Sequence, residues 1–213
     1  DGPFVLPALT LQANQRLGFM DIPGGVRIQG DLTLNTRSTF LCYAVNAPLT
    51  VEGDLVLNGN TSIYEYGILR LVAPPTLADP ALAPTNLHVL GDIVVNNGGR
   101  IRTHPLDTRD AGVARVVCDG QVTVTEQGLI TAMGAGYSGS SGKGSGYGPS
   151  PGYRDGAPGS GGASGGGHAG AGGKSYAGTL GGTNLYGSAS FPLTAGSGAG
   201  CDGGRLNYDT WMA

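Results

Sequence analysis

The sequence is short of charged residues. Only 13% of its 213 residues are Asp, Glu, Lys or Arg, and the formal net charge is −3. Globular domains carry about twice that share of charge. With no basic cluster along the chain, this balance argues against nucleic-acid binding. Disorder is also disfavoured, because a disordered chain needs low hydrophobicity and high net charge, whereas 39% of this chain is hydrophobic.

Long apolar runs and paired cysteines are also lacking. No run approaches the roughly 18 apolar residues of a membrane-spanning helix, so no membrane insertion is expected. The sequence begins at Asp1 without a signal-peptide pattern, so any signal peptide is expected upstream. Three cysteines, Cys42, Cys118 and Cys201, allow at most one internal disulfide. No segment has a convincing helical period, so we expect very little helix.

The sequence does have a repeat. Four segments align without gaps: Val26–Asn35, Leu49–Asn58, Leu87–Asn96 and Val116–Thr125. Apolar and polar residues alternate in each, which predicts strands with one buried face. Cys118 has the phase of the buried face, so we expect its thiol to be buried and free of any disulfide.

Each repeat has a glycine at the same position, where we expect the chain to bend. These glycines are Gly30, Gly53, Gly91 and Gly120. Ten residues after each comes an apolar residue, which gives the set Phe40, Ile63, Ile101 and Ile130. The shortest interval between glycines, 23 residues, fits one coil of a parallel β-helix, whose coils stack about 4.8 Å apart. The longer intervals indicate loop insertions at 73–86 and 103–115. An antiparallel sandwich is the alternative.

The second part of the chain is rich in glycine, with 27 glycines between Gly134 and Gly204. Matches to phosphate-loop, dinucleotide-binding and GxSxG motifs occur there, but no helix can follow them, so we treat them as chance. A flexible linker is the main alternative. Aromatic residues punctuate the run, which favours an ordered wall of extended segments. They are Tyr137, Tyr147, Tyr153, Tyr176, Tyr186 and Phe191.

Four stretches of this region carry a resemblance: Ile130–Tyr137, Gly165–Gly173, Tyr186–Pro192 and Gly196–Gly200. They resemble the glycine-rich module of large secreted or cell-surface parallel β-helix proteins with pectin-lyase-like solenoids. Ala169, Ala171 and Ala199 stand where that family usually has glycine. The resemblance implies that further strands follow, from the rest of a longer chain or from another molecule.

Few residues are candidates for chemistry. Asp31, Asp54 and Asp92 align directly after the shared glycine, so stacked coils would bring them together as weak Ca²⁺ candidates. The favoured alternative is that each Asp caps its own corner through its own backbone. His168 has no Asp, Glu or Cys within ten residues, which favours a packed histidine over a metal ligand or catalytic base. No aligned column stacks Arg or Lys, so the charge clamp of a β-helix lyase is missing.

Other surface features concern modification and assembly. Asn60 begins an Asn-Thr-Ser glycosylation sequon. The apolar segments 4–12 and 205–213 are unlike polar solenoid caps, and the second contains Tyr208, Trp211 and Met212 as assembly candidates.

The expected fold class is all-β: a right-handed parallel β-helix, or solenoid, with an ordered glycine-rich, extended-coil segment on the C-terminal side. We expect residues 1–133 to form the coils and 134–213 to pack on them, as one continuous domain. The favoured function is an extracellular or cell-surface structural or adhesive protein, a subunit or fragment of a larger protein or filament. Its expected partners are copies of itself, other surface proteins or a polysaccharide. The alternatives are a carbohydrate-active β-helix enzyme and a glycan- or receptor-binding fibre module. No catalytic residue and no cofactor are assigned.

Overall fold

The structure is a computed structural model. It describes residues 2–20, 22–43, 47–60, 66–73, 85–105, 114–132, 135–139, 145–153, 164, 166–167, 171–175, 179–184, 196–198 and 200. The chain divides into two compact units: a solenoid unit (Asp1–Leu106 with Gly112–Ala135) and a glycine-rich unit (Asp107–Ala111 with Gly136–Ala213). Nowhere in the described ranges is there a helix with the length and apolar character to cross a membrane.

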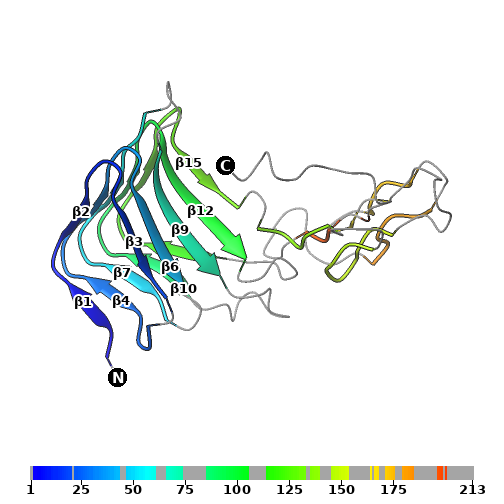
Figure 1. The fold of residues 1–213 in the computed structure, drawn as a ribbon, viewed down its shortest axis with the longest axis horizontal. Coiled ribbons are helices and arrows are strands. Elements are labelled where there is room, and N and C mark those ends of the chain that lie inside the picture. Colours follow the sequence, from blue (N-terminus) through cyan, green and yellow to red (C-terminus); the bar gives the residue numbers. More distant parts are fainter. Residues whose placement is uncertain are drawn as a thin grey trace. The chain divides into compact units, whose positions relative to one another are not determined.

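In the described part of the solenoid unit, short strands form three sheets of five strands each (Figure 1). Sheet A contains β1 (Phe4–Leu6), β4 (Val26–Ile28), β7 (Leu49–Val51), β10 (Thr85–Val89) and β13 (Arg115–Cys118). Sheet B contains β2 (Leu9–Leu11), β5 (Leu32–Leu34), β8 (Leu55–Leu57), β11 (Ile93–Val95) and β14 (Val122–Val124). Sheet C contains β3 (Arg16–Phe19), β6 (Thr39–Tyr43), β9 (Gly67–Ala73), β12 (Gly99–Pro105) and β15 (Leu129–Thr131).

All strand pairs are parallel, and each turn of the chain adds one strand to each sheet. The expected all-β parallel β-helix is therefore confirmed. The strand pairing also follows the aligned repeat, since Val26 pairs with Leu49, Leu49 with Leu87, and Leu87 with Val116. The order of strands within every sheet is the order of the coils, which rules out the antiparallel sandwich.

Two features of the coils differ from the sequence prediction. One further coil precedes the four repeats, because β1, β2 and β3 pair with β4, β5 and β6. In the third coil, the residue that pairs with Phe40 and Ile101 is Leu69, not Ile63. The sequence alignment assigned Ile63 to this position wrongly, because the third coil has extra residues before its sheet C strand. Ile63 itself lies outside the described residues.

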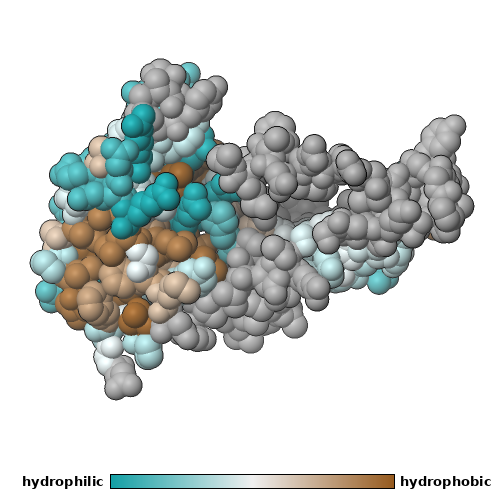
Figure 2. All heavy atoms as spheres, viewed as in Figure 1, coloured by the Kyte–Doolittle hydropathy of each residue, from teal (hydrophilic) through white to brown (hydrophobic). Residues whose placement is uncertain are grey.

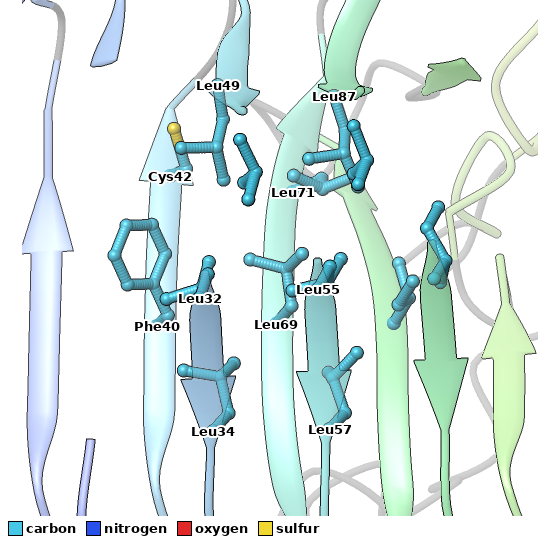
Figure 3. Close-up of a cluster of buried hydrophobic side chains, with 14 of the residues drawn as sticks. Leu32, Leu34, Phe40, Cys42, Leu49, Leu55, Leu57, Leu69, Leu71 and Leu87 are labelled. Carbon is cyan, nitrogen blue, oxygen red and sulfur yellow. The ribbon is translucent and has the colours of Figure 1, made fainter. Parts of the chain in front are cut away.

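The core fills the space between the three sheets. Two positions on each short strand point inward, and Figure 3 shows their side chains facing one another from all three sheets. Leu32, Leu55 and Leu69 are among the fully buried members. Burying an aliphatic side chain of this kind stabilises the fold by roughly 1.5–3 kcal/mol. Since every coil repeats the arrangement, the core is a column of stacked apolar rows.

The shared glycines lie at the corner between sheets A and B, as expected, but their role there is steric. A Cβ added to Gly53 would lie 2.8 Å from the carbonyl carbon of Gly30 in the preceding coil. At Gly91 and Gly120 it would lie 2.7 Å and 2.6 Å from the carbonyl oxygen of the preceding corner glycine. A side chain at any of these corners would push two coils apart, so glycine is required for close stacking.

The sheet strands extend into the ends of both expected insertions. β9 continues to Ala73 and β10 begins at Thr85, whereas β12 continues to Pro105 and β13 begins at Arg115. The remaining parts, 74–84 and 106–113, lie outside the described residues.

In the glycine-rich unit, the described residues form extended segments joined by backbone hydrogen bonds over long sequence separations. The amide of Tyr137 donates to the carbonyl of Gly196, and that of Gly167 to the carbonyl of Ser150. A Cβ on Gly182 would lie only 2.0 Å from the Ser150 carbonyl oxygen. Glycine therefore lets these backbones approach closely. Tyr153, expected to pack inward, is exposed. Packing of this unit on the coils stays a prediction.

Candidate functional site

The aligned aspartates form a hydrogen-bonded ladder along the A–B corner. Oδ1 of Asp31 accepts a hydrogen bond from the amide of Asp54 at 2.9 Å, and Oδ1 of Asp54 accepts one from the amide of Asp92 at 2.8 Å. Asp92 does the same for the amide of Gln121, also at 2.8 Å. The favoured interpretation, that each aspartate caps its own corner, was therefore wrong about the hydrogen-bond donor. Each carboxylate accepts its hydrogen bond from a backbone amide at the corner of the next coil.

This ladder gives the three carboxylates a structural task. One oxygen of each carboxylate is used to hold the next coil, through a hydrogen bond to a backbone amide. Among the described residues, no group of three or more His, Cys, Asp and Glu side chains is arranged to hold a metal ion.

A second ladder runs along the B–C corner. The side-chain amide of Asn58 donates to Oδ1 of Asn35 at 3.1 Å, and that of Asn96 donates to Oδ1 of Asn58 at 2.8 Å. Asn58 and Asn96, with Asn97, Gly59 and Thr125, line an open pocket of about 330 Å³. Because the asparagines already bond to one another, this pocket offers a ligand few free polar groups.

The last described coil exposes its apolar positions to solvent. Val122 is 53% exposed, whereas Ile93, its neighbour in the preceding coil, is fully buried. Ile130 is 45% exposed, and its neighbour Ile101 only 1%. Phe4 is likewise exposed in the first coil, and Figure 2 shows a broad hydrophobic area over the first coils. Both ends of the stack therefore present apolar surface.

Cys118 is affected by its place in this last coil. It pairs with Val89 on the inward phase, as predicted, but it is only half-buried because no sixth coil covers it in the described structure. Cys42, in contrast, is buried. Both thiols are free, and burial raises the pKa of Cys42 to about 12.

The outer face of sheet C carries a cluster of cations that the sequence alignment missed. β12 points Arg100, Arg102 and His104 outward, and Arg102 pairs directly with Arg70 on β9. Arg16 on β3 lies close enough to influence Arg70 electrostatically. We call the arginines Arg16, Arg70, Arg100 and Arg102, together with the neighbouring ring of His104, the sheet C cation cluster. The expectation that no Arg or Lys would stack was therefore wrong.

Two basic side chains on the outer face of sheet A, Arg27 and His88, have acidic partners instead. Nε of Arg27 donates to Oε1 of Glu52 at 2.7 Å. Nε2 of His88 lies 3.1 Å from Oδ2 of Asp119. Both acids come from the A–B corner, so this part of the surface is close to neutral.

Several predicted residues are not placed. His168, Cys201, Tyr208, Trp211 and Met212 lie outside the described residues. Asn60 is exposed, but Thr61 and Ser62 of its sequon also lie outside them. Glycosylation and the assembly role of the C-terminal aromatic residues therefore stay predictions.

Comparison with protein-family models, curated proteins and solved structures gives no match to this chain.

Proposed function

We propose that this chain is an extracellular or cell-surface structural or adhesive solenoid, which works as a subunit or part of a larger assembly. The observation that supports this function is the open end of the coil stack. There, inward positions such as Val122 and Ile130 are exposed, although their equivalents one coil earlier are buried.

The backbone at this end adds a second reason. β13, β14 and β15 are each the last strand of their sheet. A terminal parallel strand leaves one row of N–H and C=O groups without a strand partner, which is a template for another strand. An apolar end with three such edges suits a further coil, from another copy or from more of the same protein. When identical units join head to tail without closing a ring, they form a filament.

The test is the mass of the full chain in solution. We expect wild-type protein to form larger species as its concentration rises, measured by sedimentation velocity. Val122→Glu should block this growth, because it places a charge on the apolar end of the stack. Thr123→Glu is the matched control, since Thr123 points outward in the same strand and should not change assembly.

Circular dichroism should show that both variants keep the wild-type strand signal. A wild-type chain that is monomeric at every concentration, or equal assembly by Val122→Glu, would refute the assembly function.

A further inference from the structure

The sheet C cation cluster is a concentration of positive charge on a protein of net negative charge. The five strands of sheet C contain Arg16, Arg70, Arg100, Arg102 and His104, and no Asp or Glu. Parallel pairing places the backbones of Arg70 and Arg102 about 4.8 Å apart on neighbouring strands, with both side chains on the same face. Arg100 and Arg102 lie two residues apart on one strand, at about 6.5–7 Å. The cluster therefore covers a small area on the outer face of the solenoid.

Some donor groups of this cluster have no partner in the part of the chain that the structure describes. They are the buried Nε atoms of Arg70, Arg100 and Arg102 and Nε2 of His104. Within the described residues, no acidic side chain pairs with any of them, in contrast to Arg27 and its partner Glu52. A buried polar group without a partner destabilises the protein, and more strongly when it is charged. Several such groups at one place mark a surface that is incomplete without a ligand.

The charges of the cluster also repel one another. Burial and the nearby charges of Arg102 and Arg16 lower the pKa of Arg70. Burial and the charges of Arg102 and Arg70 lower the pKa of His104 to about 4. His104 pairs with Val72, which is only 4% exposed, so this part of the face is shielded from solvent. An anion here would both accept the unpaired N–H groups and offset the repulsion.

Arg100 shows how part of the cluster is held in place. Its guanidinium carbon lies 3.3 Å from the centre of the Tyr66 ring. Stacking on an aromatic ring uses the face of the guanidinium and leaves its N–H edge available to an acceptor. The planar fork of arginine matches carboxylate, sulfate and phosphate groups, which accept two parallel hydrogen bonds.

We propose that the outer face of sheet C, centred on Arg70, Arg100 and Arg102, is a binding site for oxyanions that carry two or more negative charges. Polycarboxylates and sulfate are the simplest members of this class. Arg70 and Arg102 hold one anionic group between adjacent strands, and Arg100 contacts a second group. This site goes beyond the structural role proposed above and does not depend on self-association.

The test measures binding of citrate to the full-length protein by isothermal titration calorimetry, at constant ionic strength set with sodium chloride. We expect citrate and inorganic sulfate to bind and to compete with each other, and acetate, with a single charge, to bind at least tenfold more weakly than citrate. Arg70→Gln and Arg102→Gln should each weaken citrate binding at least tenfold, since each removes three of the five N–H donors and the positive charge. Arg27→Gln, which removes a charge from sheet A, should change it by less than twofold.

Thermal unfolding distinguishes a binding site from a purely structural cluster. Without citrate, Arg102→Gln should unfold at a temperature equal to or higher than wild type, because the substitution relieves repulsion. With citrate, wild type should gain stability and the variant should not. The site is refuted if citrate adds nothing beyond sodium chloride, or if Arg102→Gln lowers the stability of the ligand-free protein and keeps the citrate response. Either result leaves the assembly test unaffected, because assembly is measured without citrate on variants of Val122.

Discussion

Gly53→Ala tests whether the corner glycines are needed for coil stacking. The substitution adds a single methyl group at the A–B corner of the third coil. That Cβ would lie 2.8 Å from the carbonyl carbon of Gly30 and 2.9 Å from the amide nitrogen of Asp31, both in the preceding coil. It would also collide with Oδ1 of Asp31, which accepts the hydrogen bond from the Asp54 amide. The backbone atoms cannot turn aside as a flexible side chain could, so the two coils must separate at this corner.

The expected cost has two parts. Overpacking of a close contact costs about 1–3 kcal/mol. Loss or distortion of a hydrogen bond to a carboxylate costs a further ~1.5–3 kcal/mol. The backbone of Gly53 does not have a positive φ, so conformational strain adds nothing. Together these give an expected loss of about 2.5–6 kcal/mol in the free energy of unfolding.

Two further glycines complete the series. At Gly18 in β3, an added Cβ meets only the Leu41 side chain and carbonyl, at 3.7–3.9 Å, so Gly18→Ala should be neutral or stabilise by up to ~1 kcal/mol. At Gly30 the nearest atom is the Ala8 Cβ at 3.0 Å, which predicts an intermediate cost. Urea denaturation followed by circular dichroism measures all three. Equal stability of Gly53→Ala and Gly18→Ala would show that steric contact between coils does not explain the repeated glycine.

Three further predictions concern the core, the thiols and pH. Leu55→Ala should lower the free energy of unfolding by about 2–5 kcal/mol, because Leu55 is fully buried; a loss below about 1 kcal/mol in urea denaturation would contradict the packed core. In a Cys201→Ser background, the native protein should react with a disulfide reagent at half-buried Cys118 and spare Cys42 until it unfolds, so equally fast modification of both thiols would be evidence against burial of Cys42. For His104, the pKa falls from 6.5 to about 4 on folding, so the unfolded chain takes up the proton first. The neutral His104 ring therefore contributes fully to the free energy of unfolding above about pH 6.5, and this contribution is lost as the pH falls toward 4. After allowance for solvent screening, the loss is about 1–2 kcal/mol. His104→Gln should remove that part of the pH dependence of unfolding, and identical profiles for variant and wild type would contradict it.

The sequence predicted the coils wherever their corners are alike. Four coils share a Gly-Asp or Gly-Gln corner, because stacking requires glycine and the ladder requires the following amide, and these constraints leave a visible repeat. The first coil turns through Pro7 and Ala8 instead, so it has the strands without the marker. The first coil has a neighbouring coil on one side only, and that neighbour has Gly30 at its corner. Ala8 is therefore tolerated at the corner of the first coil.

The sheet C cation cluster could not be predicted from the sequence, because its residues lie outside the aligned repeat. Alternation in Arg100-Ile101-Arg102-Thr103-His104 indicates three side chains on one face, but one strand cannot show what lies beside it. The position of Arg70 depends on the register of β9. Leu69 pairs with Phe40 although it lies sixteen residues after Gly53 rather than ten. Loop length varies freely in solenoids, so no sequence rule fixes this register.

The aspartate ladder has a consequence for the order in which the coils can form during synthesis. Each carboxylate belongs to an earlier coil and accepts the amide of a later one, from Asp31 through Asp54 to Asp92. During synthesis the acceptor therefore leaves the ribosome before its donor, and every finished coil is a template for the coil that follows. Folding can keep pace with translation, one coil at a time, without waiting for distant sequence. Damage to an early corner would then disturb the coils made after it, whereas damage to a late corner would spare those already in place.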